Sequence, residues 1–183
     1  MIALLVAVSN GVLADEVYRF DQTGSSIEFS VRQFLGTIHG KFTKFEGRID
    51  LDRERPENSS VMARIDARSI DTGMEKRDNH LRSPEFFNVD RFPEIGFKSR
   101  TLKQTGPQTA DITGEFTMHG VTKPIMLHVK LITPMNETKR TRWIVTTEPI
   151  NRRDFDLLFP PGLEAVSGIS QTVAIRIEIE ARL

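Results

Sequence analysis

The sequence predicts an all-β protein, an antiparallel barrel of about eight strands interrupted by one short helix. Several segments alternate apolar and polar side chains with a period of two, which is typical of half-buried strands. Polar turn signals at residues 53–58, 104–107 and 133–136 separate some of these segments. Many such strands joined by short turns indicate a meandering antiparallel sheet, and closing that sheet removes its exposed edges.

The first predicted strand, at residues 26–32, places Ile27, Phe29 and Val31 on one face. The last, at residues 172–182, does the same for Val173, Ile175 and alternating residues after them. The segment at 125–131 is more apolar on both faces than the others, and the one at 142–147 is shorter. In chain order the predicted strands are residues 26–32, 40–45, 45–52, 61–68, 95–100, 111–119, 125–131, 142–147 and 172–182.

A helix is predicted at residues 74–81, in the middle of this strand-rich sequence. Asp71 and Thr72 before it are good N-cap types, and Pro84 after it ends the helix because the residue before a proline avoids the α region. A second irregular stretch, residues 151–168, is long enough to act as a cover loop over the mouth of the barrel.

The chain of 183 residues is expected to form one domain. Its first 14 residues are uncharged and largely apolar, and they end in Ala14 just before Asp15. This pattern resembles the apolar region and cleavage site of a secretory signal, and it is too short to span a bilayer. We therefore expect a signal at 1–14, a single domain at 15–183 without an integral membrane segment, and a periplasmic location. The alternative for residues 1–14 is a buried N-terminal strand.

Composition argues against several classes of function. Lys and Arg number 25, as do Asp and Glu, so the net charge is zero and no nucleic-acid partner is expected. The absence of cysteine excludes thiol nucleophiles, disulfides and cysteine-bound metals. The four histidines are scattered without a metal-ligand spacing, and no GxSxG turn occurs. The sequence thus predicts neither an enzyme nor a metal or cofactor site, and it is compatible with a homodimer.

The predicted interior is almost entirely apolar, and twelve phenylalanines stand against one Trp and one Tyr. An eight-stranded barrel is either filled by its own side chains or holds one small ligand. Inward-facing Gly47, Gly114 and Ala63 leave space for a hydrocarbon chain, although small residues among large ones also fit simple interdigitation. The candidate lipid-contacting residues are Phe29, Val31, Phe42, Ile49, Ile65, Phe86, Phe87, Phe92, Phe97, Phe116, Leu127 and Ile177.

Cationic residues on the predicted helix suggest a site for a polar head group. Arg77, His80 and Arg82 lie beside the Phe-rich segment, and the forked guanidinium of arginine matches phosphate oxygens. The alternative is a solvated helix face on which Asp78 and Arg82 form an i,i+4 pair.

Five motifs resemble the YceI-like family of bacterial polyisoprenoid-binding proteins. They are SSIEFSVRQF at 25–34, GKFTKFEGRIDLD at 40–52, SIDTGMEKRDNHLRSPEFFNVDRFPEIGFKS at 69–99, GEFTMHGVTKPIMLHV at 114–129 and INRRDFDL at 150–157. The resemblance implies a lipocalin-like eight-stranded barrel, closed at one end, with one long apolar cavity. It also implies non-catalytic binding of a polyisoprenoid in the periplasm. Gln33 stands where many relatives have His, and the pattern at 154–168 is looser.

The expected function is therefore the binding, transport or sequestration of an amphiphilic lipid of the quinone or prenyl-phosphate type, with no cofactor other than that lipid. One alternative is a secreted stress-response or interaction protein with a packed barrel, which would expose an apolar patch at residues 157–161. A third hypothesis is a hydrolase or isomerase of prenyl substrates that uses His80, His119 or Asp78.

Overall fold

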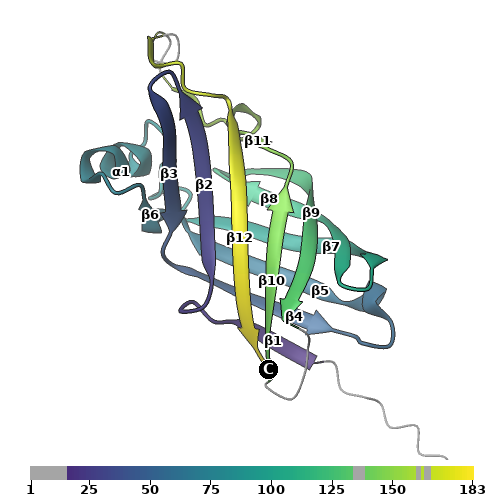
Figure 1. Ribbon diagram of the computed structural model, residues 1–183. Helices are drawn as coiled ribbons and strands as arrows, with labels where there is room; N and C mark the ends of the chain where they lie inside the picture. The colour runs from purple at the N-terminus through teal and green to yellow at the C-terminus, as the bar shows by residue number, and fades with distance from the viewer. Residues whose placement is uncertain (1–15, 134–138, 160–161, 163–165) are drawn as a thin grey trace, which may run out of the picture.

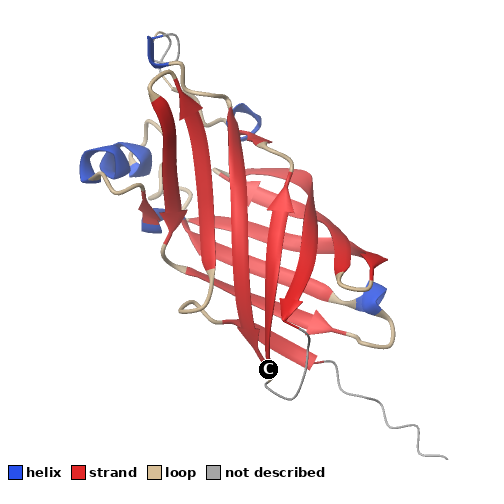
Figure 2. Cartoon of the chain, viewed as in Figure 1, coloured by secondary structure: helices blue, strands red, loops and turns tan. Residues whose placement is uncertain are grey.

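A computed structural model describes residues 16–133, 139–159, 162 and 166–183. The predicted signal at 1–14 and the turn at 134–136 lie outside the described residues. Figure 1 shows an elongated barrel with one short helix at its side, and Figure 2 shows that strands form nearly all of its wall.

The strands follow one another around the wall in an order close to that of the chain. Helix α1 comprises Glu75–Arg82, and short 3₁₀ turns η1, η2 and η3 comprise Pro56–Asn58, Ala67–Ser69 and Arg152–Phe155. The strands are β1 (Glu16–Phe20), β2 (Ser26–Gln33), β3 (Gly36–Phe42), β4 (Phe45–Leu51), β5 (Ser60–Asp66), β6 (Ile70–Asp71), β7 (Glu94–Gly106), β8 (Thr109–Met118), β9 (Val121–Thr133), β10 (Arg140–Thr147), β11 (Ile150–Asn151) and β12 (Thr172–Arg182).

The described strands close into an antiparallel ring of eight, in the order β1-β4-β5-β7-β8-β9-β10-β12, because β12 pairs with β1. At the other end of the barrel β12 pairs instead with β2, which in turn pairs with β3, and β3 pairs with β6. Three of the eight positions in the barrel wall are thus each formed by two successive strands. These pairs are β1 with β2, β3 with β4, and β5 with β6. This arrangement confirms the predicted eight-stranded barrel.

Helix α1 lies where the wall lacks a continuous strand. Strand β7 pairs with β5 only from Glu94 onward. The edge of β6 that faces away from β3 therefore has no strand beside it among the described residues. The chain between β6 and β7 forms α1 and the following turns, and it contributes Leu81, Phe86 and Phe87 to the core. The helix and the Phe-rich segment therefore complete this end of the barrel (Figure 2).

The boundaries of several elements differ from the predicted ones. Strand β1 was not predicted because its five residues, EVYRF, are too few to show a clear alternation. Strand β7 continues to Gly106 with a register irregularity between Ser99 and Thr101, which breaks the period-two pattern. The helix lies one residue later than predicted. Its N-cap is Met74, which makes no side-chain capping hydrogen bond, so the prediction of Asp71 or Thr72 as the cap was wrong.

Phenylalanine rings fill the space over the inward-facing glycines. Phe29 covers Gly40, Phe20 covers Gly47 and Phe97 covers Gly114, each so closely that no Cβ fits at the glycine without displacement of the ring. The prediction that Gly47 and Gly114 leave room for a ligand was therefore wrong, and interdigitation of small and large residues is what occurs there. Such packing of an aromatic ring on a strand glycine also fixes strand register.

We expect Gly114→Ala to lower the free energy of unfolding by about 1–3 kcal/mol, the usual cost of overpacking a core. A Cβ at this position would lie 2.5 Å from the Phe97 Cζ and 2.5 Å from the Lys98 carbonyl oxygen. The matched control is Gly96→Ala on the neighbouring strand, where the nearest atom is 3.8 Å away. Urea unfolding of both variants checks this, and equal stabilities would contradict the packing of Phe97 on Gly114.

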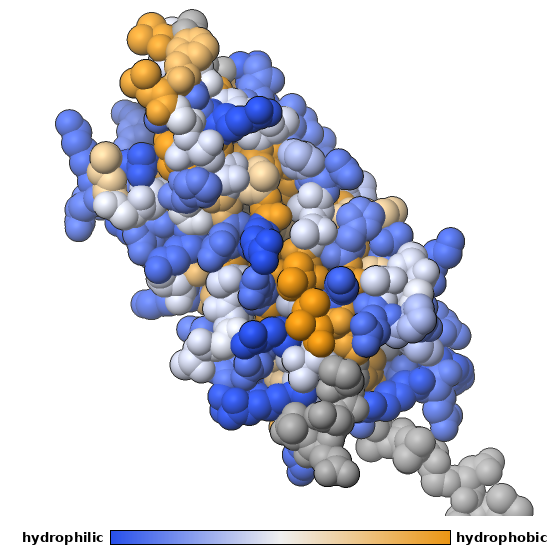
Figure 3. All heavy atoms as spheres, viewed as in Figure 1, coloured by the Kyte–Doolittle hydropathy of each residue, from blue (hydrophilic) through white to orange (hydrophobic). Residues whose placement is uncertain are grey.

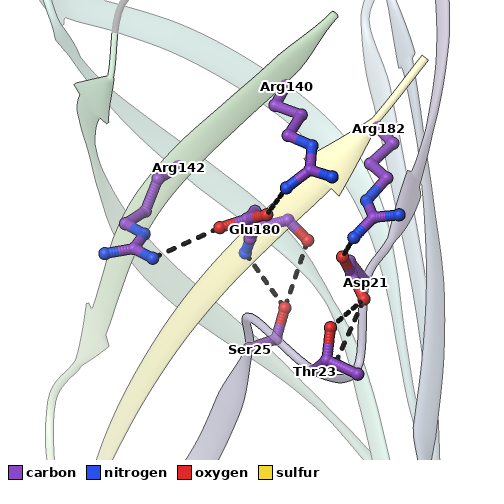
Figure 4. Close-up of polar contacts among 7 residues, drawn as sticks. All are labelled: Asp21, Thr23, Ser25, Arg140, Arg142, Glu180 and Arg182. Carbon is purple, nitrogen blue, oxygen red and sulfur yellow. Dashed lines mark hydrogen bonds and ion pairs between the residues drawn. The ribbon is translucent and has the colours of Figure 1, made fainter.

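A network of polar side chains stabilises the closure between β12 and the β1–β2 turn (Figure 4). Glu180 accepts hydrogen bonds from Arg140 and Arg142, each at 3.2 Å. The Ser25 hydroxyl bonds both the Glu180 carbonyl oxygen and the Glu180 N–H, at 3.1 and 3.0 Å. Arg182 forms an ion pair with Asp21. These contacts replace part of the backbone ladder where β12 changes its partner from β2 to β1.

The closure is expected to weaken in acid. Hydrogen bonds from Thr23, together with the charge of Arg182, hold the pKa of Asp21 below its ordinary value. A carboxyl whose folded-state pKa is lowered stabilises the fold fully above its unfolded-state pKa, and this stabilisation is lost as the pH falls through the folded-state value. We therefore expect the unfolding free energy of the wild type to fall more steeply in acid than that of Asp21→Asn. Denaturant unfolding at several pH values between neutral and about 3 measures both slopes, and parallel profiles would contradict this role of Asp21.

Candidate functional site

Two apolar cavities lie inside the barrel, one toward each end. The helix-end cavity has a volume of about 350 Å³ and is bounded by β2, β12, α1 and the segment after β11. The hairpin-end cavity has a volume of about 530 Å³ and is bounded by β9, β10, the β4–β5 connection and the β7–β8 hairpin. The family resemblance implied one long cavity, whereas the structure divides the interior into two.

Most of the predicted lipid-contacting residues line the helix-end cavity, and the structure brings them together from six separate segments of the chain. Ile49 and Leu127 line the hairpin-end cavity instead. Phe92 and Phe97 line neither cavity. The predicted residues at the helix-end cavity are Phe29, Val31, Phe42, Ile65, Phe86, Phe87, Phe116 and Ile177.

Phe92 and Phe97 have other packing roles. Phe92 packs edge-on against His119, with ring centroids 4.7 Å apart, and covers Gly120, whose backbone has a φ of +76°. Phe97 is buried on β7 and packs on Gly114 of β8. Sequence alternation predicted correctly that Phe97 points inward, but it does not reveal where along the barrel axis a side chain lies.

Arg77 is one of two predicted head-group residues that reach the helix-end cavity. Its guanidinium donates to the Thr72 hydroxyl at 2.7 Å and to the Thr72 carbonyl oxygen at 2.9 Å, and both acceptors are uncharged. Thr72 is itself held by the buried Asp78 carboxylate, which accepts from the Thr72 N–H at 3.0 Å. This local network fixes a cationic fork at the wall of an apolar cavity.

His80 also lines the helix-end cavity. Its ring is parallel to that of Phe159, and its Nδ1 lies 3.4 Å from a Glu85 carboxylate oxygen. Its Nε2 is buried without a hydrogen-bond partner among the described residues. A buried polar atom without a partner carries a desolvation cost, and a hydroxyl or phosphate oxygen of a ligand would relieve it.

Arg82, the third predicted head-group residue, does not line the cavity. Its guanidinium donates to the carbonyl oxygens of Arg68 and Ile70, each at 2.8 Å, and so ties α1 to η2 and β6. The alternative prediction of an Asp78–Arg82 pair is not realised either, because Asp78 bonds Thr72 and Arg82 bonds these backbone oxygens. Arg82 thus positions the helix on which Arg77 and His80 lie.

Sequence reasoning did not single out Arg152 as a site residue. Its side chain is 2% exposed, lines the helix-end cavity, and donates to the Leu157 carbonyl oxygen at 2.7 Å. Its guanidinium lies 4.8 Å from the centroid of the Phe159 ring. The INRRDFDL motif contains this residue, but nothing in the sequence distinguishes Arg152, which faces inward, from exposed Arg153. Gln33 and Thr72 also contribute polar groups to this wall.

The segment after β11, the cover segment, lies across the helix end of the barrel, where the sequence predicts a cover loop. Leu157 is 2% exposed, and Leu157, Phe159 and Ile169 line the helix-end cavity. The apolar patch that the packed-barrel alternative places at residues 157–161 is therefore not formed by Leu157 or Phe159, since both face inward. Leu158 is half exposed, and residues 160–161 lie outside the described part of the chain.

The outer surface at this end is apolar as well. Phe34, Leu35 and Val166 are 74%, 95% and 81% exposed, and the Phe34 N–H donates to the Ser167 carbonyl oxygen at 3.1 Å. Figure 3 shows a group of apolar atoms in orange at this end of the molecule, near the β2–β3 hairpin. Exposed apolar groups of this kind are typical of a surface that meets other apolar molecules.

The hairpin-end cavity has a rim whose charges are paired within the protein. Arg53 donates to Glu16 at 2.9 Å and to the Tyr18 hydroxyl at 3.2 Å. The Arg53 hydrogen bond lowers the pKa of Glu16, and burial raises the pKa of Tyr18. Asp52 accepts hydrogen bonds from the backbone N–H groups of Glu54 and Arg55, which hold its pKa low.

Two other kinds of site were sought in the described residues. No group of three or more His, Asp or Glu side chains there has the arrangement of a metal site. No helix in the described part of the chain is long and apolar enough to cross a membrane.

Comparison with known proteins gives the family. The model of the YceI-like domain matches residues 18–181. The chain belongs to the YceI-like family. Protein YceI of Salmonella arizonae is 38% identical over 133 residues, which cover 71% of this chain and 68% of that protein. A UPF0312 protein of Pseudomonas savastanoi is 30% identical over 183 residues, which cover 96% of this chain and 90% of that protein.

Solved structures of YceI-type barrels share the fold of this YceI-like protein. BcnA of Burkholderia cenocepacia superposes with a TM-score of 0.80 at 19% identity, covering 88% of this chain and 98% of that one. A polyisoprenoid-binding domain from Saccharophagus degradans superposes with a TM-score of 0.66 at 19% identity, covering 90% and 97%. These superpositions confirm the barrel fold that the resemblance implied.

Proposed function

We propose that this YceI-like protein binds an amphiphilic lipid with a polyisoprenoid chain and does not transform it. The chain would occupy the helix-end cavity, and a polar head of the quinone or prenyl-phosphate type would lie beside Arg77 and His80. The observation that carries the proposal is the combination of an apolar cavity with a fixed guanidinium and an unpartnered imidazole nitrogen in its wall. The name of the Saccharophagus degradans domain, a structural relative, supports the class of ligand.

The physical basis of binding is burial of hydrocarbon. Each CH₂ group transferred from water into an apolar cavity contributes about 0.8 kcal/mol. A chain of several isoprene units therefore binds through its length, and an apolar wall discriminates little among chain structures. The polar groups at the wall would fix the orientation of the ligand rather than supply most of the affinity.

The direct test is a titration of the purified protein with geranylgeranyl phosphate and geranylgeraniol. Saturable binding of both, with both ligands recovered unchanged after long incubation, is expected. Absence of binding would refute the proposal, and recovery of a hydrolysed or isomerised product would favour the enzymatic alternative instead.

We also propose that the protein is exported and binds its lipid in the periplasm. The apolar residues 1–14 support this, since they have the composition of a signal's apolar region. N-terminal sequencing of the protein from a periplasmic extract of its host should give Asp15 as the first residue. Recovery of the uncleaved chain in the cytoplasmic fraction alone would refute export.

A further inference from the structure

The hairpin-end cavity is the larger of the two, and its role is not explained by the helix-end site. Its volume of about 530 Å³ is within the usual range for small-molecule sites, roughly 300–1,000 Å³. Its wall includes Ile49, Leu51, Val129, Leu131 and Trp143. It shares no lining residue with the helix-end cavity.

On β5, β7 and β8 a layer of inward-facing residues lies between the two cavities. On β5, Ile65 lines the helix-end cavity, Val61 lines the hairpin-end cavity, and Ala63 between them lines neither. The same order recurs on β8, where Gly114 lies between Phe116 and Ile112. The layer thus crosses neighbouring strands at one level of the barrel.

Phe97 of β7 is the bulky member of this layer. It pairs in register with Ala63 on one side and with Phe116 on the other. Its ring packs on Gly114, so one large side chain occupies the space that Ala63 and Gly114 leave. Phe97 is therefore the bulky side chain that lies between the two cavities along this part of the wall.

The rim of the hairpin-end cavity favours an uncharged ligand. Asp52 and Arg53 are the charged residues that line it. Arg53 is paired with Glu16, and Asp52 is held by backbone N–H groups and by the Asn58 amide at 3.3 Å. Binding a charged head here would require these pairs to break, whereas an uncharged molecule would leave them intact.

We propose that the hairpin-end cavity is a second, separately entered binding site for an uncharged apolar molecule, and that Phe97 separates it from the helix-end cavity. The opening would lie between the β4–β5 connection, with Pro56 and Ser59, and the β7–β8 hairpin, with Gln104 and Pro107. Only the ligand assigned to the helix-end cavity rests on the proposed function, and the second site does not depend on it.

Trp143 makes the second site directly observable, because it is the one tryptophan in the sequence and it lines the hairpin-end cavity. The probe is 1-bromododecane, an uncharged chain whose bromine quenches indole fluorescence on contact. We expect saturable quenching that persists when the helix-end cavity is saturated with farnesyl phosphate. Absence of quenching would overturn the proposal. So would recovery of Trp143 fluorescence in proportion to the amount of farnesyl phosphate bound.

Matched cavity-filling variants assign the quenching to a site. Ala110→Phe fills the hairpin-end cavity and should weaken 1-bromododecane quenching of Trp143 by about tenfold or more. Val173→Phe fills the helix-end cavity and should leave that quenching unchanged. The reverse pattern, or equal effects, would overturn the proposal. If farnesyl phosphate does not bind at all, the proposed function fails, whereas this pair of variants still tests the second site.

Phe97→Leu tests the separation and keeps an apolar side chain in the core. In the wild type, geranylgeranyl phosphate should leave the 1-bromododecane quenching of Trp143 unchanged. In Phe97→Leu the longer chain should pass the layer and displace the probe, while farnesyl phosphate does so less. Identical competition in the two proteins would overturn the role of Phe97. Urea unfolding of the variant confirms that it is folded under the conditions of the assay.

Discussion

Phe116→Trp is expected to weaken the binding of geranylgeranyl phosphate about a hundredfold while leaving the protein folded. Phe116 lines the helix-end cavity from β8 and packs edge-on against Phe155 of the cover segment, with ring centroids 5.4 Å apart. A larger ring there takes volume from the cavity. Exclusion of four CH₂ groups would cost about 3 kcal/mol, which corresponds to a factor of about a hundred in Kd.

The control for this variant fills the other cavity. Ala110→Phe adds a ring of similar size to the hairpin-end cavity and should leave geranylgeranyl phosphate binding unchanged. Val173→Phe reaches the helix-end cavity from the opposite wall, on β12, and should repeat the loss if Phe116→Trp proves unstable. Titration of all three variants, with circular dichroism to confirm folding, measures the effect. A loss of similar size in Ala110→Phe would show that the assay does not report the helix-end cavity.

Arg77→Glu is expected to weaken farnesyl phosphate about thirtyfold or more and farnesol less than about threefold. A charge-assisted hydrogen bond contributes about 1.5–3 kcal/mol, and reversal of the charge adds repulsion of the phosphate. Farnesol has the same chain without the charge, so it reports any general disturbance of the cavity. The difference between the two ligands, rather than either loss alone, measures the head-group contact.

Lys76→Glu is the matched control, because it makes the same change of charge at an exposed position next to Arg77 on α1. Lys76 does not line the cavity, so its effect on both ligands should be small. Salt screens the remaining long-range electrostatic effect of Lys76→Glu on ligand binding. Equal losses of farnesyl phosphate and farnesol in Arg77→Glu, or equal effects in the two variants, would remove the head-group role of Arg77.

The wall of the barrel was largely predictable from the sequence, and its internal division was not. Alternation identifies which face of a strand points inward, and it assigned Phe29, Ile65 and Phe116 correctly to the interior. It does not specify depth along the axis. Ile49, which lines the hairpin-end cavity, and Phe97, which lies in the layer between the cavities, were therefore grouped with residues of the helix-end cavity. Their positions depend on pairing register and on the irregularity in β7, which only the folded sheet defines.

The polar residues of the site show the same limit. Arg77, His80 and Arg82 are close in sequence, but the guanidinium of Arg77 lies at the cavity while that of Arg82, further along the helix, bonds the backbone of η2 and β6. Arg152 comes from a segment far away in the chain, and its burial follows from carbonyl acceptors that the cover segment supplies. Residue type suggested a head-group site, which stays a prediction, whereas tertiary contacts decide which arginines reach the cavity.

The most direct test of the proposed function is a crystal structure of the protein with geranylgeranyl phosphate. The account predicts the isoprenoid chain in the helix-end cavity among Phe29, Phe87 and Phe116, with phosphate oxygens within hydrogen-bond distance of Arg77. A chain bound only on the outer surface, or a helix-end cavity closed by its own side chains at saturating ligand, would contradict it.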